Sequence, residues 1–238
     1  MPHDIHHTTA AVIVAAGKGI RFGDTDKKQF TEVAGYPVIL WTLSSFLTAK
    51  HIDSITLVVS AEDILPANEN IIDAHSFSKP VTVIEGGIRR QDSVFNGLMS
   101  LSDDVCYAAI HDGVRAATKP GLIDSVCVKA YEVGAALPAV TATDSTFIGQ
   151  SMKIDRYIDR TVLWQAQTPQ VFLRNKILEA HDRAQKEGID GSDDGMLYKR
   201  YIGDVAVVEG DETNMKLTYQ YDVVMLEAAL KQRGRPEL

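Results

Sequence analysis

Short apolar segments that favour β-strands alternate with helical patterns along the chain, and this alternation restricts the possible folds more than any other feature. The apolar segments are continuous, so each strand would be buried on both faces. Such strands form mostly parallel sheets with helices packed on both sides. We therefore predict an α/β fold with a mostly parallel, doubly wound, Rossmann-like sheet. The predicted strands comprise residues 10–16, 54–60, 81–84, 105–110, 135–140 and 205–208. The predicted helices comprise residues 37–47, 90–101, 122–133, 173–186, 194–201 and 219–232.

One segment departs from this alternation. No repeat, low-complexity stretch or flexible linker divides the chain, so we expect a single domain over residues 1–238. Residues 144–164 are polar and lack helical periodicity, and we interpret them as an extended arm or hairpin inserted into the core. A lone hairpin carrying Ile148, Tyr157 and Trp164 would be marginally stable. We therefore expect the arm to pair with a second copy in a homodimer.

Charge and composition narrow the possible partners. The net charge of −8 makes the chain a poor general binder of nucleic acid, so an anionic ligand needs a local cluster of Lys and Arg. No apolar run approaches the ~20 residues of a membrane span, and the polar N-terminus does not resemble a signal peptide. Cys106 and Cys127 lie in apolar stretches, and we interpret them as reduced core residues of a cytoplasmic protein.

The first candidate site follows the first predicted strand. Ligands of open α/β sheets bind beyond the carboxyl ends of the strands. Gly17, Gly19 and Gly23 follow this strand, with Arg21 between the last two and Lys28 close behind. The glycine spacing differs by one residue from the dinucleotide pattern G-x-G-x-x-G, and no P-loop Gly-Lys-Ser/Thr is present. Taken alone, the turn fits a phosphate site and a solvated loop equally well.

Two further strands end in polar groups. Residues 85–94 follow the third strand and open a helix, which fits either a second wall of a nucleotide site or an ordinary helix start. Asp112 ends the fourth strand, where a carboxylate can hold Mg²⁺, a ligand hydroxyl or a backbone cap. Its neighbour His111 is better interpreted as structural. No Ser-His-Asp order and no zinc-type Cys/His spacing is present, which disfavours acyl transfer and zinc chemistry.

The motifs taken together resemble those of one family. In chain order they are AAGKGIRFG at 15–23, KQF at 28–30, EGGIRRQDSV at 85–94, HDGVR at 111–115, GAALPAV at 134–140, DR..LW..QTPQ.F at 159–172 and EG…N.K.T at 209–218. Each motif is weak alone, but their order across residues 10–230 resembles the 2-C-methyl-D-erythritol 4-phosphate cytidylyltransferase family of the non-mevalonate isoprenoid pathway.

The resemblance implies a reaction and an assembly. The expected activity is Mg²⁺-dependent transfer of CMP from CTP to the phosphate of 2-C-methyl-D-erythritol 4-phosphate, with release of pyrophosphate and no covalent enzyme intermediate. The expected assembly is a homodimer whose arms embrace the partner's active site. The partners are thus CTP, a small sugar-alcohol phosphate and a second copy of the chain, with neither nucleic acid nor membrane.

The resemblance also implies roles for individual residues. The expected catalytic cations are Arg21, Lys28 and Lys216. The expected nucleotide contacts are Ala15, Ala16, Gly17, Gly19, Gly87, Arg90 and Ser93. The expected contacts to the sugar phosphate are Asp112, Arg115, Ser145, Arg160 and Thr168, and Asp112 is also the expected metal ligand. The chain departs from the family's usual pattern in having Lys27 and Ala116 in place of Pro, and Ser145 in place of Thr.

Three alternatives stay open at this point. The ribitol 5-phosphate cytidylyltransferase family shares the Gly-rich turn, HD..R and QTPQ, although the DR..LW and GAALPAV motifs favour methylerythritol phosphate. A dinucleotide-dependent oxidoreductase would leave Arg21 and Lys28 unexplained. A non-catalytic nucleotide-binding relative would be expected to have lost Arg21, Lys28, Asp112 or Lys216, and all four are present.

Overall fold

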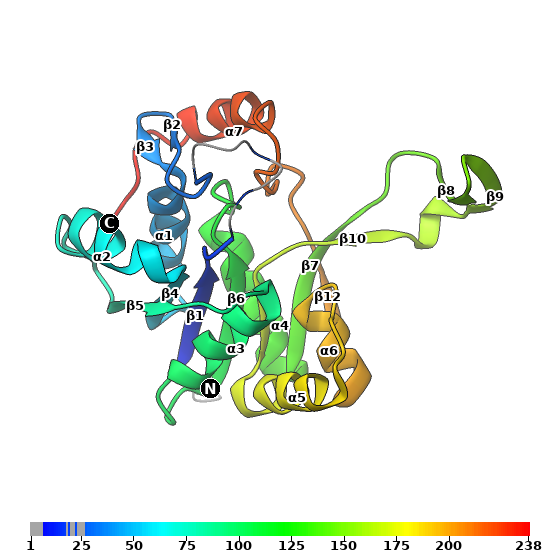
Figure 1. Cartoon of the computed structure of the whole chain (residues 1–238), viewed down its shortest axis with the longest axis horizontal. Helices are drawn as coiled ribbons and strands as arrows, with labels where there is room; N and C mark the ends of the chain where they lie inside the picture. The colour runs from blue at the N-terminus through cyan, green and yellow to red at the C-terminus, as the bar shows by residue number, and fades with distance from the viewer. Residues whose placement is uncertain (1–6, 18, 20–21, 23–26) are drawn as a thin grey trace, which may run out of the picture.

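A mixed, mostly parallel sheet forms the centre of the computed structural model, which describes residues 7–17, 19, 22 and 27–238 (Figure 1). Its strands follow the order β10-β7-β11-β6-β1-β4-β5, and β12 pairs with β7. Their bounds are β1 (Thr9–Val14), β4 (Ser54–Val59), β5 (Val81–Glu85), β6 (Tyr107–Asp112), β7 (Ala135–Thr141), β10 (Trp164–Ala166), β11 (Gln170–Leu173) and β12 (Ala206–Glu209). Parallel pairing of β5, β4, β1 and β6 confirms the predicted α/β class.

Two strands run against this direction. β11 pairs antiparallel with both β6 and β7, and β10 pairs antiparallel with β7. Neither strand was predicted, because each is short and their residues were interpreted only as part of a motif. β11 separates the two long strands β6 and β7, so it brings Thr168 and the residues around it beside the carboxyl end of β6.

Helices cover both faces of the sheet because successive side chains of each strand point to opposite sides. Ala11 and Ile13 of β1 pack with α1 and α4, whereas Ala10 and Val12 pack with α3, α5 and α6. The helix bounds are α1 (Val38–Thr48), α2 (Ile64–Ala67), α3 (Arg90–Ser100), α4 (Pro120–Val133), α5 (Arg174–Glu187), α6 (Asp194–Tyr201) and α7 (Asp222–Lys231). Helical turns lie at η1 (Ala61–Asp63), η2 (Asn68–Ile72) and η3 (Arg160–Val162). The sheet is therefore covered on both faces, as predicted.

Close packing of α3 against the sheet depends on one glycine. A Cβ added to Gly97 would lie 2.3 Å from Cγ1 of Val12 in β1, a distance that real Cβ atoms do not reach. The missing side chain thus lets α3 approach the first strand. Because α3 starts at Arg90, this packing also sets the position of the loop between β5 and α3.

A small hairpin supports the start of α1. β2 (Glu32–Val33) and β3 (Tyr36–Pro37) pair antiparallel, and the indole Nε1 of Trp41 donates to the carbonyl of Val33 at 2.9 Å. Val33 and Trp41 pack with α7 in a third apolar cluster. The hairpin was not predicted, and it fixes the segment that follows Lys28 against α1.

The segment predicted as an arm forms a hairpin that projects from the sheet (Figure 1). β8 (Thr146–Gln150) and β9 (Lys153–Ile158) pair antiparallel with a bulge at Gly149. Its large side chains include Phe147 and Tyr157, which are about half exposed or more in the single chain. The hairpin itself agrees with the interpretation from sequence, while its pairing with a second copy stays a prediction.

The structure tests two further predictions, that both cysteines are buried and that no helix spans a membrane. Both cysteines are free, and Cys127 is buried in α4 as expected. Cys106 is exposed, so its assignment to the core was wrong; β6 begins only at Tyr107, after this residue. Among the described residues, no helix combines the length and apolarity needed to cross a bilayer.

Candidate active site

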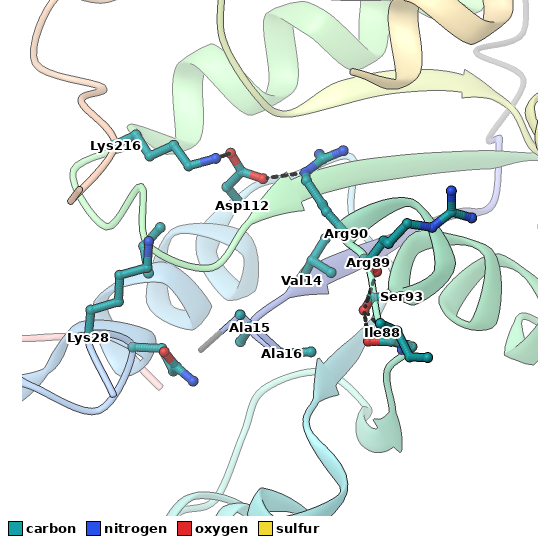
Figure 2. Close-up of a pocket in the computed structure, with 14 residues that line it drawn as sticks. Val14, Ala15, Ala16, Lys28, Ile88, Arg89, Arg90, Ser93, Asp112 and Lys216 are labelled. Atoms are coloured by element: carbon teal, nitrogen blue, oxygen red, sulfur yellow. Dashed lines mark hydrogen bonds and ion pairs between the residues drawn. The ribbon is translucent and has the colours of Figure 1, made fainter. Parts of the chain in front are cut away.

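The carboxyl ends of β1, β5 and β6 open into a cavity of about 160 Å³ (Figure 2). Its lining joins segments that lie far apart in the sequence, and it includes nine of the residues expected to act in binding or catalysis. These are Ala15, Ala16, Gly17, Lys28, Gly87, Arg90, Ser93, Asp112 and Lys216. Parallel strands place their carboxyl ends at one edge, which is why these residues meet.

Backbone groups form one wall of the cavity. The amide of Ala15 is held by the carbonyl of Val58 at 2.7 Å, so the chain after β1 follows the end of β4. On the other side, the amide of Gly87 donates to Oγ of Ser93 at 3.0 Å, which folds the loop after β5 onto the start of α3. A Cβ added to Gly87 would lie 2.3 Å from Cβ of Asp92, so this close turn requires glycine.

Asp112 lies opposite this wall and binds cations from three directions. Its Oδ1 accepts from Nε of Arg90 at 2.9 Å, and its Oδ2 accepts from Nζ of Lys216 at 2.8 Å. Nε of Arg115 is 3.8 Å from Oδ2. Burial alone would raise the pKa of Asp112, but Arg90, Lys216 and Arg115 outweigh it and hold this pKa well below its usual range. The carboxylate is thus ionised and gathers cations from α3, the loop after β6 and the segment after β12.

Arg90 bridges two buried carboxylates. Its Nη1 donates to Oδ2 of Asp194 at 2.9 Å, while its Nε donates to Asp112. His181 Nε2 lies 3.0 Å from Oδ1 of Asp194. Burial lowers the pKa of Arg90, but the two carboxylates outweigh this and raise it above its usual value. The sequence predicted Arg90 but missed Asp194 and His181, whose only signal was their position in predicted helices.

A buried polar network supports Asp112 from behind. The amide of Asp112 donates to Oγ1 of Thr168 at 3.2 Å, and that hydroxyl lies 2.9 Å from Nδ1 of His111. Thr118 Oγ1 donates to the side-chain oxygen of Asn214 at 2.6 Å. Burial lowers the pKa of His111 to about 3, so the imidazole is neutral at pH 7. Thr168 therefore contacts Asp112 rather than the cavity, and His111 is structural.

Lys28 and Lys216 line the same cavity and come from different parts of the chain (Figure 2). A Cβ added to Gly19 would lie 3.6 Å from Cγ of Lys28, so Gly19 packs on the lysine stem rather than lining the cavity. Arg21, the remaining predicted catalytic cation, lies outside the described residues. Gln29, which the sequence did not single out, also lines the cavity.

A second cavity of about 380 Å³ adjoins the first, and Lys216 lines both. Arg115 lies in this second cavity, where its Nη1 donates to the carbonyl of Asn214 at 2.7 Å. Its other lining residues come from β7, β10, the segment after β12, and the residues just after β7 and β10, which include Thr143 and Gln167. An ammonium shared between two adjoining cavities can contact two anionic groups at once.

Ser145 and Arg160 do not join either cavity within one chain. Both are exposed, and they flank the projecting hairpin. Nη1 of Arg160 donates to the carbonyl of Thr143 at 2.9 Å, at the base of the arm. Their expected contact with the sugar phosphate stays a prediction.

The side chains that line the first cavity could hold a divalent cation only together with the phosphates of a bound nucleotide. Asp112 is the sole carboxylate among the described residues that line the first cavity. No group of three or more metal-ligating side chains occurs in the part of the chain that the structure describes. Mg²⁺ in nucleotide sites is commonly held by one or two carboxylates together with substrate phosphates and water. The residues present thus fit a metal that arrives with a nucleotide.

Comparison with known proteins identifies the family. A profile of the 2-C-methyl-D-erythritol 4-phosphate cytidylyltransferase family matches residues 9–232. A protein of that name from Alkaliphilus oremlandii is 34% identical over 226 residues, covering 94% of this chain and 96% of its own. One from a Synechococcus strain is 39% identical over 228 residues, covering 94% and 99%. The crystal structure of 4-diphosphocytidyl-2C-methyl-D-erythritol synthase from Anaerococcus prevotii superposes with a TM-score of 0.84 at 27% identity, covering 95% of this chain and 97% of that one. A profile match over most of the chain, relatives above 30% identity and a shared fold agree, and the chain belongs to the 2-C-methyl-D-erythritol 4-phosphate cytidylyltransferase family.

Proposed function

We propose that this protein transfers the cytidylyl group of CTP to the phosphate of 2-C-methyl-D-erythritol 4-phosphate, forming CDP-methylerythritol and pyrophosphate. Besides family membership, one observation carries the proposal. Arg90, Arg115 and Lys216 surround Asp112 where two cavities meet at the carboxyl ends of the strands, and Lys28 lines the first of these cavities. Cations concentrated there, in a chain whose net charge is −8, suit two phosphorylated ligands.

The two cavities divide the ligands between them. The first cavity, with its backbone wall from Ala15 to Gly17 and at Gly87, takes CTP. Backbone carbonyls and amides there would distinguish cytosine from uracil through the exocyclic amine. The second cavity, with Arg115, takes the sugar phosphate. Lys216 lies in both, so it neutralises the attacking phosphate and the triphosphate together.

The reaction requires positioning and charge neutralisation rather than a base. An oxygen of the sugar phosphate attacks the α-phosphorus of CTP, the bond from that phosphorus to the bridging oxygen breaks, and pyrophosphate leaves. The attacking phosphate is already ionised at pH 7, so no proton has to be removed. Negative charge grows on the phosphoryl oxygens, and Lys28, Lys216 and Arg21 are the proposed cations that stabilise it. His111 is neutral and buried, so it has no part in proton transfer.

Asp112 organises these cations. It pairs with Arg90 and Lys216 before any substrate binds, so their side chains are already ordered. We propose that, in the complex with substrates, Asp112 also accepts a hydrogen bond from a hydroxyl of the sugar. Asp112 is also the protein group that would hold Mg²⁺ together with the phosphates of CTP, where the metal would offset part of the triphosphate charge.

We further propose that the active enzyme is a homodimer in the cytoplasm. The hairpin of one chain exposes apolar side chains, and Arg160 and Ser145 at its base lie outside both cavities. A two-fold partner would cover the hairpin and receive Arg160, a permanent cation suited to phosphate. The free thiols of Cys106 and Cys127 fit a reducing compartment.

The decisive experiment measures pyrophosphate release by the purified protein. We expect release with CTP and methylerythritol phosphate together, little with UTP, and little when ribitol 5-phosphate replaces methylerythritol phosphate. Excess EDTA should abolish the activity. Faster turnover with ribitol 5-phosphate would reject the proposed substrate, and a labelled cytidylyl-enzyme trapped during turnover would reject direct displacement.

A further inference from the structure

Lys27 and Lys28 are neighbours in the sequence, but their side chains meet different groups. Lys28 lines the first cavity. Nζ of Lys27 instead lies 2.7 Å from both carboxylate oxygens of Asp63, 3.0 Å from Oε1 of Glu62 and 3.2 Å from Oγ of Ser60. These acceptors belong to one short stretch that directly follows β4. We call this set of contacts the Lys27 anchor.

The Lys27 anchor is built from partly buried groups. Only 9% of the Asp63 side chain and 31% of the Lys27 side chain is exposed, and Oγ of Ser60 also donates to Asp63. Burial lowers the pKa of the Lys27 ammonium, but Asp63 and Glu62 outweigh this and raise it above its usual value. Breaking a partly buried ion pair costs more than breaking an exposed one, because the remaining charge is left without its partner. Such pairs therefore hold their side chains in position better than exposed pairs do. Lys27 is therefore charged, neutralised and directed away from the phosphate cavity.

The other side of Lys28 is held through the backbone. The carbonyl of Gln29 accepts from the amide of Ile39 at 2.9 Å, and the carbonyl of Thr31 accepts from the amide of Val38 at 3.0 Å. Gln29 as a whole residue is 1% exposed. Lys28 thus lies between two attachments, the Lys27 anchor at the end of β4 and the backbone bonds to the start of α1.

We propose that Lys27 is a positioning residue for Lys28. The Lys27 anchor fixes the backbone immediately before Lys28, so that the Lys28 ammonium is held in place before CTP binds. Preorganised charge stabilises a transition state more than charge that must first be ordered, and small displacements of a catalytic group are costly. This inference rests on the proposed function for its kinetic consequences, although its structural consequence can be measured without activity.

The first test compares the steady-state kinetics of three variants, Lys27→Met, Lys27→Arg and Lys199→Met. Met keeps most of the side-chain length but removes the charge, and Arg restores it. Lys199 pairs with Asp204 on the surface of α6, so Lys199→Met is a matched loss of an exposed pair. We expect kcat to fall at least ~10-fold in Lys27→Met, with KM for the sugar phosphate changed less than about twofold. Lys27→Arg should recover most of the loss, and Lys199→Met should match the wild type.

A double variant then separates positioning from direct contact. If Lys27 acts through Lys28, Lys27→Met/Lys28→Met should have the same kcat as Lys28→Met alone. A further loss of about 10-fold in the double variant would show that Lys27 contacts the phosphates itself and would overturn the proposal. Near wild-type kcat in Lys27→Met would overturn it as well.

Amide hydrogen exchange without ligand provides the test that needs no activity. The amide of Phe30 donates to the carbonyl of Lys27 at 2.8 Å and reports on this turn. We expect exchange at residues 28–30 to accelerate at least ~10-fold in Lys27→Met and in Asp63→Asn, while α5 is unchanged. Unchanged exchange at 28–30 in a folded Lys27→Met variant would overturn the anchor. Absence of CTP-dependent pyrophosphate release in the wild type would instead reject the proposed function and leave this result standing.

Discussion

Lys28 is the residue on which the proposed chemistry can be tested most sharply. Its side chain lines the same cavity as Asp112 and Lys216. One preorganised charge is typically worth about 2.7–4 kcal/mol of transition-state stabilisation, so Lys28→Ala should lower kcat at least ~10²-fold. Lys186, which pairs with Asp182 on the surface of α5, provides the control Lys186→Ala. Turnover of Lys28→Ala close to that of the control would contradict the assignment.

Asp112 is a carboxylate at the centre of a site for anionic ligands, and its contacts with the surrounding cations explain why it lies there. Without a carboxylate between them, Arg90, Arg115 and Lys216 would repel one another, whereas Asp112 holds Arg90 and Lys216 by hydrogen bonds on separate oxygens. Asp194 repeats the arrangement on the far side of Arg90. The cations are therefore fixed in position without being fully neutralised, which is the condition for electrostatic preorganisation.

His111 makes the free energy of unfolding depend on pH. Burial lowers its pKa to about 3 from the ordinary 6.5. Between these values the unfolded chain binds a proton that the folded chain does not, so the free energy of unfolding falls as the pH falls. In that window, His111 lowers the free energy of unfolding by at most about 1.4 kcal/mol for each pH unit. Above that window, it causes no dependence on pH.

His111→Asn should weaken this acid dependence, because Asn keeps an acceptor near the position of Nδ1 but cannot bind the proton. Urea unfolding at several pH values between about 7 and about 4.5 measures it. We expect a shallower decline in the free energy of unfolding for the variant than for the wild type. Parallel declines would show that His111 is not the group responsible.

The turn of the β8–β9 hairpin is strained for the residues that form it. Ser151 and Met152 both have positive φ, 51° and 61°, and neither is glycine. Two-residue hairpin turns of this conformation favour Asn-Gly. Ser151→Asn/Met152→Gly should therefore stabilise the hairpin by up to about 1 kcal/mol and slow amide exchange in β8 and β9. Met152 is fully exposed in the single chain, so its replacement removes no contact within that chain, and faster exchange would contradict the prediction.

The proposed dimer predicts that two impaired variants can restore activity together. Arg160→Ala should raise KM for the sugar phosphate more than for CTP, since Arg160 lies at the base of the arm rather than in the nucleotide cavity. In a mixed dimer of Arg160→Ala and Lys28→Ala, one of the two composite sites carries both wild-type residues. After exchange of subunits, about a quarter of the wild-type activity should return. Sedimentation as a monomer, or mixtures that stay inactive, would reject the dimer.

Much of the fold could be predicted because its strands are buried on both faces and its helices begin and end at clear signals. α6 occupies the predicted residues 194–201, and the predicted parallel strands were recovered to within a few residues. β10 and β11 were missed, because a short strand between motif residues carries little pattern of its own. The helical segment from η1 to η2 was missed as well, since residues 61–72 contain a proline and form three short turns rather than one helix.

The amino-acid sequence by itself determined the α/β class, the inserted arm and the set of charged residues at the strand ends, since each depends on local pattern or on residue type. Only the tertiary structure decided which charges pair. Lys27 and Lys28 are adjacent and chemically identical, yet one binds Asp63, 36 residues away, and the other lines the cavity. Arg90 likewise divides its donors between Asp112 and Asp194, which lie 22 and 104 residues from it. An ion pair depends on what the fold places within about 3–4 Å, and no local pattern encodes that distance.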